Sequence, residues 1–90
     1  MPISIYIRES FQNIDILCDE IWDLPSQLDA LETWLDNVGM HLEPNEYVAD
    51  IGFSMREDAS GGGGVLSSKA MLILGQIGMD VYFSEYHLVK

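Results

Sequence analysis

Apolar and polar side chains alternate with a period of two in four separate segments of this chain. The first covers residues 3–8 (ISIYIR), with three isoleucines on one face, and the others cover residues 14–19, 47–56 and 79–86. This period is typical of a β-strand with one buried face. Only a short polar turn separates the first two segments, so we expect them to pair as an antiparallel hairpin.

A helix is predicted between the second and third strands, because apolar residues recur there at spacings of three and four. Its apolar stripe comprises Leu28, Leu31, Leu35 and Val38, with Trp34 beside it. Pro25-Ser26 predicts the start of the helix, with the Ser26 side chain as its cap and Asp29 close to the positive end of the helix dipole. Gly39 predicts its end.

A second helix is predicted between the third and fourth strands. Its apolar side comprises Leu66, Ala70, Ile73, Leu74 and Ile77. Met71 and Leu72 widen this side, which predicts deep burial of the helix. Ser67 or Ser68 is placed to cap its start, and Gly78 is placed to end it.

The element order is therefore β-β-α-β-α-β. This order predicts a two-layer α+β fold, in which one mixed four-stranded sheet carries both helices on one face. The third strand, second helix and fourth strand form a strand-helix-strand unit, so we expect those two strands to be parallel. Ninety residues suffice for one modest core, so residues 1–90 are predicted to form a single domain.

Four consecutive glycines, residues 61–64, lie between the third strand and the second helix. A phosphate-binding P-loop requires a lysine directly after its last glycine, whereas Val65 occupies that place here. The glycine spacing of dinucleotide-binding folds is also missing. We therefore interpret residues 57–66 as a flexible glycine-rich connection within the domain.

Side chains suited to covalent or metal chemistry are sparse. Cys18 is the only cysteine, and His41 and His87 lie far from it in the sequence, so neither a nucleophile–base pair nor paired zinc ligands are evident. The alternation around Cys18 predicts a small buried residue within a strand. The acidic segments at 18–23 and 43–46 lack the loop pattern that wraps calcium. The sequence favours a protein that is not an enzyme and uses no cofactor or metal.

Charge is distributed unevenly along the chain. Fifteen acidic residues oppose four basic ones, giving a formal net charge of −11, of which residues 1–50 carry −10 and residues 51–90 only −1. Such a potential repels nucleic acids and anionic membranes and attracts basic protein surfaces. The same charge also keeps a protein soluble without any partner, and this interpretation stays open. The N-terminus shows no signal-peptide pattern and no apolar run is long enough to span a membrane, so we expect a cytoplasmic protein.

The candidate binding residues lie between the second strand and the end of the first helix. Asp29, Glu32 and Asp36 recur at helical spacing and line one ridge. No lysine or arginine occurs between residues 9 and 55 to pair with them locally, so we expect an unpaired ridge. Trp22 lies among carboxylates and is a candidate aromatic anchor. The predicted partner-binding set is Asp19, Glu20, Trp22, Asp23, Asp29, Glu32 and Asp36.

Residues 65–86 (VLSSKAMLILGQIGMDVYFSEY) follow a strand and a glycine-rich loop. This arrangement resembles the C-terminal part of a bacterial domain family of unknown function, in which a leucine-rich helix ends at a glycine and leads into a strand. The matching positions are Gly62, Leu66, Ser67, Leu74, Gly78, Asp80, Phe83 and Tyr86. Small acidic α+β proteins of this kind also resemble immunity proteins encoded beside secreted toxins. The resemblance covers the C-terminal two-thirds of the chain and implies no functional residue.

Three functions fit these observations. The first is an immunity-type protein that neutralises a basic, nuclease-like toxin by electrostatic docking, with a tryptophan or tyrosine as anchor. The second is a nucleic-acid mimic of the anti-restriction or anti-CRISPR type, whose carboxylates stand in for phosphates. The third is a housekeeping domain that is merely acidic. The first two imply a basic protein partner, and an exposed sheet edge would also allow a homodimer.

Overall fold

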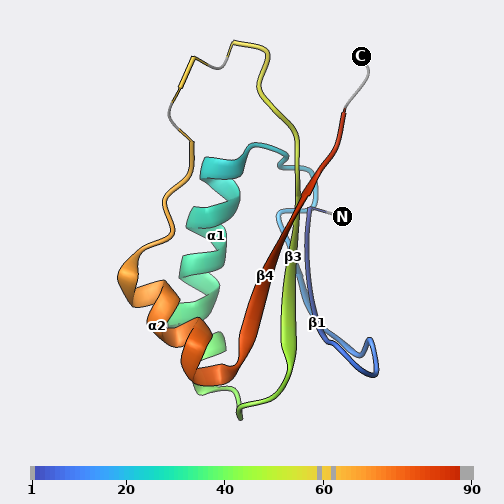
Figure 1. Ribbon diagram of the computed structural model, residues 1–90, viewed down its shortest axis with the longest axis vertical. Helices are drawn as coiled ribbons and strands as arrows, with labels where there is room; N and C mark the ends of the chain where they lie inside the picture. Colours follow the sequence, from blue (N-terminus) through green and yellow to red (C-terminus); the bar gives the residue numbers. More distant parts are fainter. Residues whose placement is uncertain (1, 59, 62, 88–90) are drawn as a thin grey trace.

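The computed structural model describes residues 2–58, 60, 61 and 63–87 of the chain. In chain order the elements are β1 (Ile3–Ile7), β2 (Asn13–Leu17), α1 (Leu24–Asn37), the 3₁₀ turn η1 (Gly39–His41), β3 (Tyr47–Phe53), α2 (Ser68–Ile77) and β4 (Met79–Glu85). Both helices cover the same face of the sheet, so the fold has two layers (Figure 1). The predicted order β-β-α-β-α-β and the α+β architecture are confirmed.

The four strands form one sheet in the order β2-β1-β3-β4. β1 runs antiparallel to both β2 and β3, whereas β3 and β4 are parallel and are connected through α2. The sheet is therefore mixed, as predicted, and its two edges are β2 and β4. The hairpin of β1 and β2 contains one irregularity in register, between Ile5 and Tyr6.

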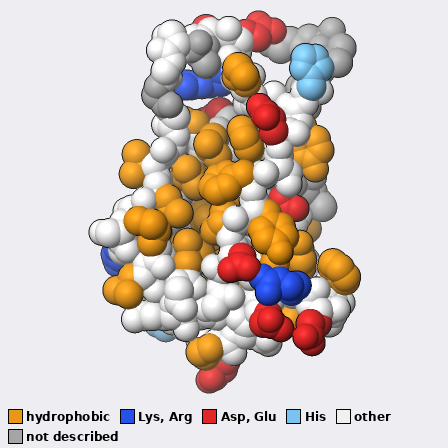
Figure 2. Space-filling model, viewed as in Figure 1, with side chains coloured by type: hydrophobic (Ala, Val, Ile, Leu, Met, Phe, Trp, Pro, Cys, Tyr) orange, Lys and Arg blue, Asp and Glu red, His pale blue; other side chains and the backbone are white. Residues whose placement is uncertain are grey.

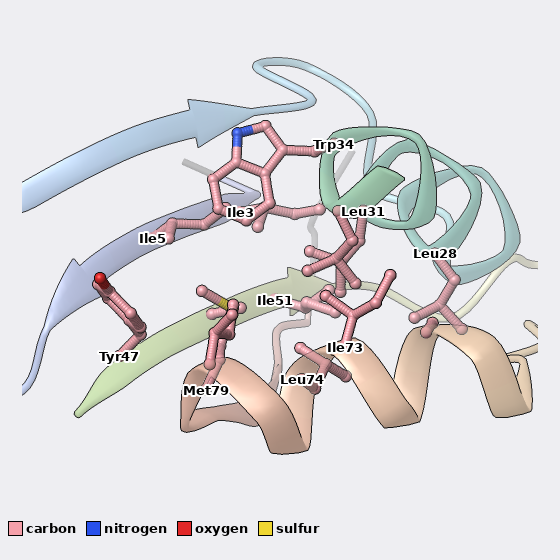
Figure 3. Packing of buried hydrophobic residues seen from close by; sticks show 14 residues of the cluster. Ile3, Ile5, Leu28, Leu31, Trp34, Tyr47, Ile51, Ile73, Leu74 and Met79 are labelled. Atoms are coloured by element: carbon pink, nitrogen blue, oxygen red, sulfur yellow. The ribbon is translucent and has the colours of Figure 1, made fainter. Parts of the chain in front are cut away.

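The core lies between the sheet and the two helices (Figure 3). The sheet supplies alternate residues of β1 and β3, among which Ile3, Ile5 and Ile51 are fully buried. The helices supply Leu28, Leu31, Trp34, Leu35, Ala70, Ile73, Leu74 and Ile77. Each element thus turns one apolar face inward, with the period of two or 3.6 that its backbone imposes.

The start of α1 differs from the prediction. The cap is Asp23, whose backbone is extended and whose Oδ2 accepts the Ser26 N–H at 3.0 Å. Ser26 therefore lies inside the first turn and does not cap it. Pro25 lies in the first turn of α1, where the backbone N–H groups have no partner within the helix, so its missing N–H is tolerated.

The end of α1 also differs in detail. The helix ends at Asn37, and Gly39 opens the 3₁₀ turn that follows. A Cβ on Gly39 would lie 2.7 Å from the Trp34 ring and 2.8 Å from Leu35, so this glycine is needed for close packing. Val38 was predicted to belong to the apolar stripe but is 44% exposed, because the helix has already ended there. The buried face of α1 instead includes Gln27.

The ends of α2 agree with the sequence. Ser67 is the cap, with its Oγ accepting the Ala70 N–H at 3.1 Å, and Gly78 follows the helix in the left-handed conformation (φ +83°). The predicted deep burial of the helix is wrong, since Met71 is 52% and Leu72 62% exposed. In a two-layer fold only one side of α2 can meet the sheet, and these two residues lie off that side.

β1 and β4 end one residue before their predicted ends, and two other strands end two or three residues early. β2 ends at Leu17, and Cys18 follows it with a left-handed backbone (φ +55°) and a half-buried side chain, so the prediction that Cys18 lies within a strand is wrong. β3 ends at Phe53, after which the Ser54 N–H donates to the Trp22 carbonyl oxygen at 2.9 Å. Met55 was predicted to lie on the apolar face of this strand, but it lies beyond the strand and is exposed.

The glycine-rich connection, residues 57–66, joins β3 to α2 as expected. Its Ala59 and Gly62 lie outside the described residues. Gly61 and Gly63 have positive φ, and the described residues of this segment belong to no helix or strand.

Candidate functional site

Asp19 and Glu20 lie in a turn, residues 18–23, that joins β2 to α1. The Ile21 N–H closes this turn by donating to the Cys18 carbonyl oxygen at 3.2 Å. Both carboxylate side chains are exposed, and neither has an ion pair or hydrogen bond within the described residues. Their charges therefore face solvent.

Asp23 performs a structural task at the end of the same turn. Hydrogen bonds from Ser26 lower the pKa of the Asp23 carboxyl below its usual value, because they stabilise the charged form. The carboxylate also lies at the positive end of the α1 dipole. Asp23 thus fixes the start of α1 and is directed toward the helix backbone.

Trp22 packs edge-on against Tyr86, with ring centroids 5.7 Å apart and an interplanar angle of 81°. The Tyr86 ring lies over Gly52, where an added Cβ would come within 2.9 Å of it. Trp22 is half-buried, whereas Tyr86 is 51% exposed, so the two rings form an aromatic pair at the surface. Tyr86 was not in the predicted set, although a glycine inside a strand signals that another group approaches the backbone closely.

The carboxylate ridge of α1 is not unpaired, contrary to the prediction. Glu32 accepts two hydrogen bonds from Ser67, one from its N–H at 3.2 Å and one from its hydroxyl at 2.9 Å. Asp36 forms an ion pair with Lys69 at 3.2 Å. Two of the three ridge carboxylates therefore attach α1 to the start of α2, and only Asp29 is exposed without such a contact among the described residues. The partners were not foreseen because they lie more than thirty residues away in the sequence.

Arg8 is the single arginine or lysine among the first fifty residues, and it lies at the opposite end of β1 from the acidic turn. Its guanidinium pairs with Asp80 and, at 3.5 Å, with Glu46. A hydrogen bond with Tyr82 is the main cause that raises the pKa of Arg8. Because these contacts occupy Arg8, it does not offset the charges of Asp19, Glu20 and Asp29.

The chemistry of Cys18 disfavours a nucleophile at this position. Burial, with a smaller contribution from the nearby Asp23 charge, raises the pKa of the Cys18 thiol. A raised pKa keeps sulfur in the less reactive thiol form at neutral pH. In the described part of the chain, no group of three or more His, Cys, Asp or Glu side chains is arranged to hold a metal ion.

Two hollows lie where β3 and β4 end. The larger, about 610 Å³, is lined by Ser54, Met55, Arg56, Glu57, Glu85, Tyr86 and His87. The smaller, about 160 Å³, lies between the start of α1 and the glycine-rich connection. The lining of the larger hollow includes both a basic side chain, Arg56, and two acidic ones, Glu57 and Glu85, so it does not select a ligand of one charge.

No protein family, curated protein or solved structure matches this chain. The resemblance to immunity-type proteins therefore stays a prediction from the sequence. Across the described residues, neither helix has the length and apolar character required to cross a bilayer.

Proposed function

We propose that this chain is a non-catalytic acidic binding protein that docks onto a basic protein partner. The contact surface is the acidic turn (residues 18–23) together with the exposed side of α1. One observation carries the proposal: Asp19, Glu20 and Asp29 are exposed and have no internal partner among the described residues. They belong to the part of the chain that carries −10 of the net charge.

The Trp22–Tyr86 pair complements these charges. Unpaired carboxylates raise the association rate with a basic surface and fix its orientation, but rim charges alone add little affinity. An aromatic side chain that becomes fully desolvated supplies more of the binding free energy. Trp22 is two residues from Glu20, so steering charges and an aromatic anchor occur on one turn.

An immunity-type protein that neutralises a nuclease-like toxin is the form of this function that the resemblance implies. Nucleases carry basic active-site surfaces that bind phosphates, so a carboxylate-rich turn would block substrate access. An immunity protein of this kind protects the cell that makes the toxin. Under this proposal, the protein therefore acts in the cytoplasm.

Nucleic-acid mimicry has less support than docking onto a toxin. A mimic requires a row of carboxylates that are free to stand in for phosphates. Glu32 and Asp36 each hold an internal partner, which reduces the row on α1 to Asp29.

The test is affinity capture from the host lysate, followed by kinetics with the purified partner. We expect a basic protein whose association rate falls as salt rises, and whose nuclease activity is inhibited by stoichiometric binding. The triple variant Asp19→Asn, Glu20→Gln, Asp29→Asn should slow association by about tenfold or more. Trp22→Ala should instead raise the dissociation rate.

The matched control is Glu9→Gln, Glu43→Gln, Asp58→Asn. These three acids are also exposed, and the variant has the same net charge as the first triple variant. Equal slowing by both triple variants would show that net charge alone, and not this surface, governs association. Capture of nothing basic at low salt would contradict the proposed function as a whole.

A further inference from the structure

The outer side of β4 is an open sheet edge. The Tyr86 N–H donates to the Phe53 carbonyl oxygen on β3 at 2.8 Å. The N–H and C=O groups of successive residues in a strand point to opposite sides. The even-numbered residues of β4 therefore bond to β3, whereas the N–H and C=O groups of Val81 and Phe83 point away from β3. Within the described residues, no hydrogen bond reaches the main chain of either residue from another element. The edge can therefore accept a further strand.

Apolar side chains line this edge on the helix-covered face of the sheet. Val81 and Phe83 are on the helix-covered face, since they pair in register with the buried Ala49 and Ile51. Phe83 is nevertheless 51% exposed, because no strand lies beyond it. In the view of Figure 1, β4 lies in front of β3, and hydrophobic side chains gather beside it on the same face in Figure 2. The core is thus incompletely covered at this edge.

The exposed apolar surface continues onto α2. Lys69 faces α1 through its ion pair with Asp36. Met71 is two residues further on, about 200° around the helix, and so faces away from α1. Gly75, one turn later, has open space around it. A neighbour added beside β4 would therefore also meet an apolar, sterically open side of α2.

We propose that this surface binds a second copy of the chain. The two β4 strands pair antiparallel about a two-fold axis at Tyr82, which joins the two sheets into one of eight strands. Centring on Tyr82 lets all seven residues of each strand, Met79–Glu85, take part. Val81 then faces Phe83 of the second copy, so both hydrogen-bonded central pairs are apolar.

Charge favours a second copy over the basic partner at this edge. In the proposed register Asp80 faces Ser84 and Glu85 faces Met79, so no acid opposes an acid. Residues 51–90 carry only −1 of the net charge, so two copies meet through their least acidic part. A basic partner is drawn instead to the acidic turn.

Sedimentation equilibrium and light scattering test the dimer directly. We expect the apparent mass to rise with concentration from 10.1 kDa to twice that value. Phe83→Lys should raise the dimer dissociation constant by about tenfold or more, since it places charge inside the interface. The matched control is Leu72→Lys on the outward side of α2, which should leave the constant unchanged. A wild-type mass that stays monomeric at millimolar concentration would overturn the proposal.

The register is tested with a cysteine at the two-fold axis. In the variant Cys18→Ser, Tyr82→Cys the two cysteines form a non-hydrogen-bonded pair with Cα atoms about 4.5 Å apart, which a disulfide can bridge. We expect a covalent dimer under mild oxidation, and none with Cys18→Ser, Leu72→Cys. Equal cross-linking of both variants would overturn the β4 interface.

Salt separates this proposal from the proposed function. Two copies of a protein with charge −11 repel each other at long range, so salt should strengthen the dimer. Binding to a basic partner should weaken with salt. A dimer that weakens with salt would contradict pairing through the β4 edge and leave the partner proposal intact.

Discussion

At the scale of single residues, Gln27 is a buried polar side chain whose amide nitrogen is hydrogen-bonded and whose Oε1 has no partner among the described residues. Its side chain is fully buried, and its Nε2 donates to the carbonyl oxygens of Ile21 at 2.8 Å and Gly52 at 2.7 Å. One side chain of α1 thereby attaches the acidic turn and β3 to the helix layer. Without it, the Gly52 carbonyl, whose hydrogen bond is buried, would lose its donor in a place that water does not reach easily.

Gln27→Ala should therefore lower the free energy of unfolding by about 3 kcal/mol, from two lost hydrogen bonds and a small cavity. Urea denaturation measures this as a lower midpoint with an unchanged slope. The control Gln76→Ala removes an exposed glutamine of α2 and should change stability by less than about 0.5 kcal/mol. Equal effects of the two changes would mean that the buried contacts are unimportant.

Asp23 makes a pH-dependent contribution to the free energy of unfolding. Its hydrogen bonds to Ser26 hold its pKa below the ordinary value of 3.8, so its charged form stabilises the folded state. This stabilisation is complete above the unfolded pKa and is lost as pH falls through the folded pKa. Asp23→Ala should cost about 1 kcal/mol at pH 7 and progressively less below pH 3.8. Asp23→Asn should retain most of the stability at neutral pH, since asparagine caps helices as well.

Urea midpoints of the three proteins across this pH range provide the measurement. A difference between wild type and Asp23→Ala that stays constant with pH would rule out the charged cap. The same pair of variants also distinguishes a cap from a binding residue. If Asp23 serves only α1, Asp23→Asn binds the partner as wild type does.

At the scale of elements, Gly75 inside α2 and Gly78 directly after it should respond oppositely to the same change. Gly78 has φ +83°, and an added Cβ would fall well inside van der Waals contact with the Asn45 carbonyl oxygen. Gly75 lies in the helix interior with no atom within 4 Å of an added Cβ. Gly78→Ala should destabilise by about 2 kcal/mol, whereas Gly75→Ala should stabilise by about 0.5–1 kcal/mol. Thermal melts of both variants test the opposite signs, and destabilisation by Gly75→Ala would contradict the open environment.

The junction between α1 and α2 is a second test at this scale. Glu32 accepts from Ser67, whose hydroxyl oxygen in turn accepts the Ala70 N–H, so a half-buried carboxylate supports the cap of α2. Glu32→Ala should lower the free energy of unfolding by about 1.5–3 kcal/mol. Asp36→Ala removes an exposed ion pair and should cost less than about 1 kcal/mol. If Asp36→Ala matches Glu32→Ala in urea denaturation, the hydrogen bonds to Ser67 are not what joins the helices.

Whether the sequence could predict a feature depends on how far apart in the sequence the interacting residues lie. The strands, the helices and the Gly78 stop depend on spacing and conformation within a few residues, so periodicity revealed them. The contacts of Glu32 with Ser67 and of Trp22 with Tyr86 join distant segments, and no local pattern encodes them. The exposure of the Met71 and Phe83 side chains depends on which helices and strands pack beside them, and this also is not encoded locally. For the candidate site, the acidic turn stays a prediction, whereas the expected unpaired ridge on α1 is wrong because Glu32 and Asp36 bind residues of a distant segment.

At the scale of the whole molecule, the charge of −11 is confined to a body of 40 × 27 × 17 Å. The Debye length is about 30 Å at 0.01 M salt and about 8 Å at 0.15 M. At low salt every carboxylate therefore acts on most of the others, and at 0.15 M only near neighbours interact. The ion pairs of Arg8 and Lys69, in the described part of the chain, offset only a small part of the acidic charge, so repulsion between carboxylates outweighs attraction in the folded state.

The melting temperature should consequently rise between 0.01 M and 0.15 M NaCl, measured at a protein concentration where the chain is monomeric. A gain of about 1 kcal/mol corresponds to about 4–8 °C for a domain of this size. Replacing Asp19, Glu20 and Asp29 by their amides takes the net charge from −11 to −8, so that variant should melt higher at low salt and respond less to NaCl. A wild-type melting temperature that falls with salt would show that ion pairs such as Asp36–Lys69 stabilise the fold more than its excess charge opposes it.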